Sequence, residues 1–146
     1  MRYLSRVTLL AGVATLTSYS GCAKPPAAPQ INPVLRIEAL PPADPQKVSS
    51  VRNMKDWKNP NLIVRVDGVA LLDPSNNEQR ILKPDQLVGA LAELPGSAWP
   101  YGRVVAVAEN AVSGSDADNA QLRRNRAVVA GTLESLQVLI NWVPSA

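Results

Sequence analysis

From residue 61 onward, apolar and polar positions alternate as they do in short strands and amphipathic helices. Residues 62–66 alternate with a period of two, which predicts a half-buried strand. Asp67-Gly68 follows and is a strong hairpin-turn dipeptide, so residues 69–72 are predicted to form the return strand. An alternative interpretation carries the strand through Gly68 as a bulge and places the turn at 73–77.

The next segments predict a short strand, a helix and a buried strand. Residues 80–82 form the short strand. Pro84 suits the first position of a helix, and an apolar stripe at i, i+4 and i+7 begins at Leu87. Pro95-Gly96 ends this helix. Residues 104–108 are a continuous apolar run, which is typical of a central strand buried on both faces.

A second helix is predicted over 118–137, and a last strand over 138–143. Asp118 with Gln121 three residues later fits a capping box. Gly131 falls in the middle of this helix, where glycine costs about 1 kcal/mol relative to alanine. Its presence there indicates close packing of the helix on the sheet.

Together these elements predict a small α/β domain, an α+β sandwich, over residues 61–146. Apart from the short strand at 80–82, its order is β-β-α-β-α-β, with two helices on one face of a mixed sheet. Residues 104–143 read as strand, crossover helix and strand, a unit that is right-handed and makes its two strands parallel.

Before residue 61 the composition changes. Residues 22–46 hold seven of the thirteen prolines, which favours an extended, semi-rigid tether. Within it, residues 34–37 alternate like a strand that could add to a sheet edge or stay disordered. Residues 47–60 are a basic approach segment around Trp57. It could contact anionic lipid headgroups or a glycan, or it is a solvated approach in which Trp57 covers the edge of the core.

Residues 1–21 have the order of a secretory signal peptide. Arg2 and Arg6 precede an apolar stretch over 7–16, and small residues follow. The apolar stretch is shorter than the roughly 20 residues that a membrane-spanning helix needs. Cys22, the only cysteine, comes directly after this leader.

The run Ser20-Gly21-Cys22-Ala23 resembles the lipobox of bacterial lipoproteins, although Tyr19 stands where that family usually has an aliphatic residue. The resemblance implies that the Cys22 thiol is lipidated and that Cys22 becomes the first residue of the mature chain. The alternative is an ordinary signal peptide cut after Ala23, which would remove Cys22.

Charge and composition exclude several function classes. The net charge is +3, but two of the 15 basic residues belong to the leader, which leaves 13 against 12 acidic residues. This balance gives no support for a nucleic-acid partner. The chain has no histidine and no cysteine besides Cys22, which excludes imidazole catalysis and cysteine or histidine zinc sites. It also lacks a nucleophile elbow and a phosphate-binding loop. No cofactor or metal is expected.

Paired carboxylates remain the one catalytic option. Glu109 and Asp116 bound a polar loop, and Asp118 lies close by. Carboxylates beside a helix N-terminus are more often caps than acid–base pairs. The same run resembles the start of a calcium loop but lacks its glycine and its terminal glutamate.

The candidate partner-binding residues lie between the central strand and the second helix. Three arginines there form the densest positive cluster of the domain, and beside free backbone N–H groups they could bind an anion such as a carboxylate. The alternative is a solvated helix face on which the arginines pair with Asp116 and Asp118. The full candidate set is Asn110, Ser115, Asp116, Asp118, Arg123, Arg124 and Arg126.

Residues 114–128 resemble the second half of OmpA-like peptidoglycan-binding domains. The shared features are Gly114-Ser115-Asp116-Ala117-Asp118-Asn119, then Leu122, then Arg124-Asn125-Arg126-Ala127-Val128. The resemblance implies that Arg126 holds the diaminopimelate of the peptide stem. The aspartate that assists in that family is replaced by Ala111, and the Gly-His-Thr-Asp signature is missing.

The whole domain is also similar to the periplasmic domain of ExbD/TolR-like transport proteins. The similarity is carried by Val66-Asp67-Gly68 and by Pro100-Tyr101-Gly102-Arg103-Val104-Val105. In that family the second run begins a helix, whereas here it leads into a predicted strand. The family's transmembrane anchor is absent, so a lipid anchor would replace it.

These observations predict a non-enzymatic, lipid-anchored envelope protein at the outer membrane, facing the periplasm, or alternatively a soluble periplasmic or secreted one. Its domain would bind an envelope protein partner or peptidoglycan, and oligomers are possible. One alternative is a structural subunit of an envelope assembly, with the proline-rich arm ordered on a neighbour. The other is a hydrolase that uses carboxylates alone.

Overall fold

The computed structural model describes residues 32–74, 76, 78–110 and 114–144. The predicted leader, the lipidation site at Cys22 and the first part of the tether lie outside the described residues. The described residues, from Asn32 onward, belong to one compact unit. Residues 32–60, which the sequence pattern set apart as tether and approach segment, pack against the rest of this unit.

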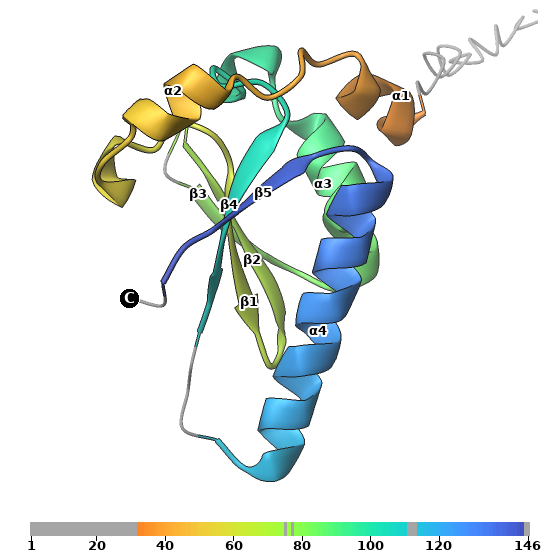
Figure 1. Ribbon diagram of the computed structural model, residues 1–146. Helices are drawn as coiled ribbons and strands as arrows, with labels where there is room; N and C mark the ends of the chain where they lie inside the picture. The colour runs from red at the N-terminus through yellow and green to blue at the C-terminus, as the bar shows by residue number, and fades with distance from the viewer. Residues whose placement is uncertain (1–31, 75, 77, 111–113, 145–146) are drawn as a thin grey trace, which may run out of the picture. The chain divides into compact units, whose positions relative to one another are not determined.

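The core of the fold is one five-stranded sheet in the order β3-β2-β1-β4-β5 (Figure 1). β1 pairs with β2 and β2 with β3 in antiparallel fashion, whereas β1 with β4 and β4 with β5 are parallel. The predicted mixed α/β sandwich is therefore confirmed. The strands are β1 (Asn61–Arg65), β2 (Gly68–Asp73), β3 (Glu78–Leu82), β4 (Val104–Glu109) and β5 (Leu139–Trp142).

The first hairpin confirms the return-strand interpretation rather than the bulge. Arg65 pairs with Gly68, so the two-residue turn is Val66-Asp67, one residue before the predicted Asp67-Gly68, and Gly68 is the first residue of β2. Gly68 has φ +147°, and a Cβ there would collide with the backbone oxygen of Leu82 on β3. Glycine is therefore required at the start of β2 both by its backbone conformation and by the close approach of β3.

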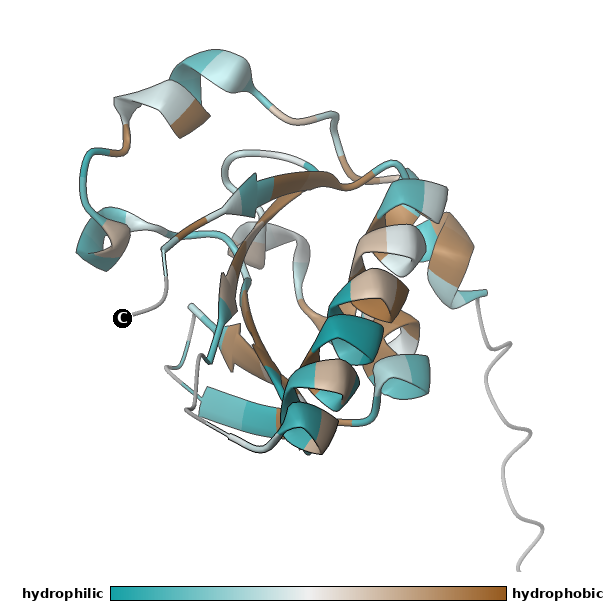
Figure 2. Ribbon diagram, turned by 60° about the horizontal axis from the view of Figure 1, so that its bottom comes forward, coloured by the Kyte–Doolittle hydropathy of each residue, from teal (hydrophilic) through white to brown (hydrophobic). Residues whose placement is uncertain are grey.

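Two helices cover one face of the sheet. The first predicted helix begins as a 3-10 turn, Pro84–Gln86, and continues as α3 (Leu87–Glu93). The second is α4 (Asp116–Ser135). Figure 2 shows apolar residues along the strands and on the sheet-facing side of these helices. The main core includes Leu62, Val64, Leu71, Val105, Val107, Leu91, Val129 and Leu133.

The start of α4 corrects the predicted cap. Ser115, not Asp118, is the N-cap residue, and Asp118 occupies the third helical position of the capping box. The Asp118 backbone N–H donates to Ser115 Oγ at 3.2 Å, and Ser115 N–H donates back to Asp118 Oδ2 at 3.0 Å. The pairing with Gln121 was wrong because a serine three residues before Asp118 provides the better cap.

Gly131 also departs from expectation, because it lies on the exposed side of α4 and no atom would lie within 4 Å of a Cβ there. Close packing is therefore not the reason for this glycine. We expect Gly131→Ala to raise the free energy of unfolding by about 1 kcal/mol, since it removes the helix-propensity cost of glycine without a clash. Chemical denaturation would measure it, and an unchanged or lower stability would contradict the open surroundings of this position.

The segment before the sheet forms α1 (Pro33–Glu38), α2 (Pro45–Ser50) and a 3-10 turn, Met54–Asp56. The predicted strand at 34–37 was therefore wrong. The Asn32 side chain accepts a hydrogen bond from the Val34 N–H, and Pro33 occupies the first helical turn, where its fixed φ suits a helix. Ile37 is fully buried in the main core, and α1 packs against α3.

From α1 the chain crosses to the second face of the sheet, the one opposite α3 and α4 (Figure 1). There Trp57 packs on Val104 and Ala106 of β4. The smaller side chains Ala43, Val48 and Val51 pack on the same cluster. This segment thus supplies a second, smaller core.

Backbone hydrogen bonds attach this segment to the turn before β4. The Arg103 N–H donates to the Pro41 oxygen, and the Asp44 N–H donates to the Tyr101 oxygen, both at 2.9 Å. Gly102 has φ +76°, and a Cβ at this position would collide with the Pro42 backbone. The turn therefore needs glycine to let the segment approach.

Candidate functional site

The predicted site residues lie at the edge of the sheet where the parallel strands end. β1, β4 and β5 run in the same direction, so their carboxyl ends meet at one edge, and α4 begins there. We call this the carboxyl edge. Open α/β sheets place their binding sites at such edges. Asn110 directly follows β4, and Ser115, Asp116 and Asp118 form the start of α4.

A surface hollow of about 270 Å³ opens at the carboxyl edge. The structure brings two predicted residues together in it, Asn110 and Asp118. The opposite side of the hollow comes from the β1–β2 turn, which sequence reasoning interpreted only as a turn. The lining residues are Arg65, Val66, Asp67, Asn110, Gly114 and Asp118.

Arg126 links α4 to the ends of two strands. Its Nη1 lies 2.8 Å from Glu109 Oε1, at the end of β4, and its guanidinium lies 4.5 Å from the ring centroid of Trp142, at the end of β5. A cation this close to an indole face is attracted by the ring. Half of the Arg126 side chain is exposed, and Trp142 is 42% exposed. We call these three residues the Arg126 cluster.

The other two arginines are not part of this arrangement. Arg123 and Arg124 are exposed. Arg124 donates to the Gln121 side-chain oxygen of its own helix, at 2.6 and 3.2 Å. The predicted pairing of the arginines with Asp116 and Asp118 is therefore not the pairing seen, because Arg126 pairs with Glu109. Asp118 instead completes the capping box with Ser115.

Asn125 is a buried polar residue that sequence reasoning missed. Its side-chain amide donates to the backbone oxygens of Arg65 and Val66 at 2.8 and 3.2 Å. Its Oδ1 accepts from Gln121 at 2.9 Å. Asn125 therefore fastens the β1–β2 turn to α4 and fixes one side of the hollow. The available signal was a polar residue at a position where the apolar stripe of the helix faces the sheet.

Arg65 and Asp67 form an ion pair at the mouth of the hollow. Arg65 Nε donates to Asp67 Oδ1 at 2.8 Å, and Nη2 donates to Oδ2 at 3.1 Å. These hydrogen bonds lower the pKa of Asp67 and raise the pKa of Arg65. Asp67 is thus held ionised, which makes it a weaker proton acceptor than an ordinary aspartate.

We expect Arg65→Ala to return the pKa of Asp67 toward its ordinary range, because the hydrogen bonds and the neighbouring charge are lost. The folded pKa of Asp67 is lowered, so the pair stabilises the fold above the unfolded pKa and that contribution is lost as the pH falls through the folded pKa. The stabilities of variant and wild type should therefore converge in acid. An NMR titration of the Asp67 carboxyl measures the shift, with Arg124→Ala as the control that should leave it unchanged.

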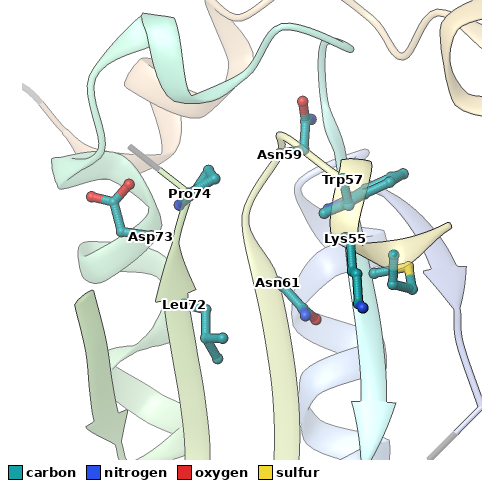
Figure 3. A pocket seen from close by; sticks show the side chains of 8 residues that line it. Lys55, Trp57, Asn59, Asn61, Leu72, Asp73 and Pro74 are labelled. Carbon is teal, nitrogen blue, oxygen red and sulfur yellow. The ribbon is translucent and has the colours of Figure 1, made fainter. Parts of the chain in front are cut away.

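A second hollow, also of about 270 Å³, lies on the second face near the start of β1 (Figure 3). Lys55, Trp57, Asn59 and Asn61 line it together with Met54, Leu72, Asp73 and Pro74. Trp57 is only 8% exposed, and its indole N–H donates to the Pro60 oxygen at 3.3 Å. Its burial agrees with the interpretation in which Trp57 covers the edge of the core.

Within the described residues, no group of three or more carboxylate, cysteine or histidine side chains could hold a metal ion. No helix in the described part of the chain has the length and apolar content needed to cross a membrane. Comparison with known proteins adds no assignment, because no family model, no curated protein and no solved structure matches the chain.

Proposed function

We propose that this chain is a lipid-anchored cell-envelope protein whose small α/β domain acts as a binding or scaffold module for a protein partner. The partner docks at the carboxyl edge. The observation that supports this most directly is the Arg126 cluster, a half-exposed cation between a carboxylate and an exposed indole. Arginine and tryptophan, like tyrosine, are enriched among the energetic centres of protein interfaces.

The geometry of the carboxyl edge favours recognition over catalysis. Three of its carboxylates are engaged in structural contacts: Glu109 with Arg126, Asp67 with Arg65, and Asp118 in the helix cap. An acid–base catalyst at neutral pH needs a carboxylate with a raised pKa, whereas the pKa of Asp67 is lowered. These contacts also fix the side chains in place, which reduces the entropy lost on binding.

The packing of α1 shortens the distance between the proposed anchor and the domain. The described structure begins at Asn32, ten residues after Cys22. Ten extended residues span at most about 35 Å. A lipid on Cys22 would therefore keep the domain close to the membrane surface.

Co-purification of the full-length chain from detergent-extracted membranes tests the proposal. Mass spectrometry of the eluate identifies both the lipid on Cys22 and the bound proteins. We expect Arg126→Glu to lower partner recovery at least tenfold. Arg124→Glu makes the same charge change on the same helix, away from the cluster, and should retain the partner. Equal recovery with both variants would refute docking at the Arg126 cluster, and an unmodified Cys22 would refute the anchor.

Peptidoglycan is the second candidate partner, favoured by the position of Arg126 in the OmpA-like run. In the structure this guanidinium already pairs with Glu109, so a stem-peptide carboxylate would have to displace that residue. Sedimentation of the full chain with purified peptidoglycan separates the two candidates. If the chain sediments with peptidoglycan and Arg126→Ala abolishes this binding, the cell wall is the partner. If the chain stays in the supernatant, the protein partner remains as the candidate.

A further inference from the structure

The two edge strands of the sheet, β3 and β5, differ in how well they are protected against pairing with a strand of another chain. The exposed edge strand β3 carries Glu78 and Arg80, charges of the kind that block further strand pairing. The other edge strand, β5, reads Leu-Ile-Asn-Trp and has no charge and no proline. Leu139 is 50% exposed and Trp142 is 42% exposed. β5 is therefore an edge open to another strand.

The hydrogen bonds of β5 show which backbone groups face outward. Leu139 N–H donates to the Arg103 oxygen, and Val143 N–H donates to the Val107 oxygen, both at 2.9 Å toward β4. Backbone groups alternate in direction along a strand, so those of Ile140 and Trp142 point away from the sheet. The outer edge thus offers two donors and two acceptors, two residues apart.

We propose that β5 pairs with β5 of a second copy of this chain, antiparallel and about a twofold axis at Asn141. In this register Ile140 lies opposite Trp142 of the second copy, and each pair exchanges two backbone hydrogen bonds, as in a hydrogen-bonded antiparallel pair. All four outward groups are then satisfied. The strand is complementary to itself, as a twofold interface requires.

The side chains agree with this register on both faces. Register with β4 places Ile140 and Trp142 on the helix-covered face, and Leu139, Asn141 and Val143 on the second face. The pairing therefore brings Ile140 against Trp142, and Leu139 against Val143 of the second copy. Apolar and aromatic cross-strand pairs of this kind stabilise sheets. Leu139, which is 50% exposed in a single copy, becomes covered.

Charge on the neighbouring flank of α4 favours the same antiparallel arrangement. Arg126 contacts Trp142, so its side of the helix faces β5. Steps of three and four residues place Arg123, Ala130 and Glu134 on this side. In the dimer the two α4 helices run antiparallel, so the Arg123 end of one approaches the Glu134 end of the other. A parallel pairing would bring like charges together.

Disulfide trapping in the full-length chain tests the register. Opposed residues of a non-hydrogen-bonded pair have Cα atoms about 4.5 Å apart, within the roughly 4.4–6.8 Å that a disulfide accepts. We expect Asn141→Cys to form a disulfide-linked dimer under mild oxidation. Gln79→Cys, on the other edge strand β3, is the matched control. It should form no more disulfide-linked dimer than the wild type, whose only cysteine is Cys22. Equal cross-linking by both variants would overturn the proposal.

A second pair of variants keeps the test independent of disulfide chemistry. Leu139 and Ile81 are exposed to similar extents, 50% and 55%, on edge strands at opposite sides of the second face. Leu139→Lys should lower the dimer fraction in sedimentation velocity at least tenfold, and Ile81→Lys should leave it unchanged. A monomeric wild type would overturn the proposal. Leu139→Lys leaves the Arg126 cluster intact. If this variant still captures the partner, the proposed function stands whether or not the chain forms the β5 dimer.

Discussion

Ile37→Ala should lower the free energy of unfolding by about 2–5 kcal/mol, the range for truncating a fully buried aliphatic side chain. Ile37 has no exposed surface and belongs to the main core, where α1 packs against α3. The loss has two parts, the transfer free energy of the removed atoms and the cavity they leave. Denaturant-induced unfolding of the full chain measures it through the shift of the transition midpoint.

Leu35→Ala is the matched control for this prediction. Leu35 lies on the same short helix but is 57% exposed, so its removal should change stability by less than about 0.5 kcal/mol. If Ile37→Ala were equally mild, α1 would behave as a spacer rather than as part of the domain. The pair of variants therefore decides where the folded unit begins.

The strands and helices after residue 60 could be predicted from the sequence because each has a strong local signal. The period-two pattern of β1, the Asp67-Gly68 dipeptide and the continuous apolar run of β4 depend only on neighbouring residues. The structure has all three elements nearly where the pattern placed them. The pattern alone left the return strand and the bulge open. The structure decides for the return strand, because β2 begins at Gly68 directly after a two-residue turn.

The segment before residue 61 was misjudged because its local pattern is ambiguous. Proline-rich composition favours an extended spacer, but proline also suits the first turn of a helix, where both Pro33 and Pro45 lie. The decisive contacts join Ile37 to α3 and Pro41 to Arg103, residues that lie far apart in sequence. These long-range contacts determine the structure of the segment, and no apolar periodicity within residues 32–46 predicts them.

The candidate site was predictable only in part for the same reason. Asn110, Asp118 and Arg126 could be placed near one another because the strand end and the helix start are adjacent in sequence. The partners that give them their roles come from elsewhere. Trp142 lies sixteen residues after Arg126, and Arg65 and Asp67 come from the β1–β2 hairpin, which Asn125 connects to the helix. Contacts between residues of different strands and helices can be predicted only when the order of the strands in the sheet is known. The sequence pattern does not determine that order.

Trp57→Ala should lower the free energy of unfolding by about 3–5 kcal/mol, the range for removing a buried aromatic side chain. Trp57 covers Val104 and Ala106 on the second face, and its ring lies 5.3 Å from that of Tyr101 in an edge-on arrangement. Loss of the Trp57 ring exposes β4, which lies between the parallel strands β1 and β5. Thermal and denaturant unfolding of the full chain both report the change.

Met54→Ala serves as the control, because Met54 lines the same hollow but is 37% exposed, so its removal should be mild. The comparison also separates the two interpretations of the basic segment around Trp57. A tryptophan that served only to contact lipid headgroups or a glycan would be replaced with little loss of stability, and vesicle or glycan binding would fall instead. A large loss of stability, with the Met54 variant unaffected, assigns Trp57 to the core rather than to a lipid or glycan contact.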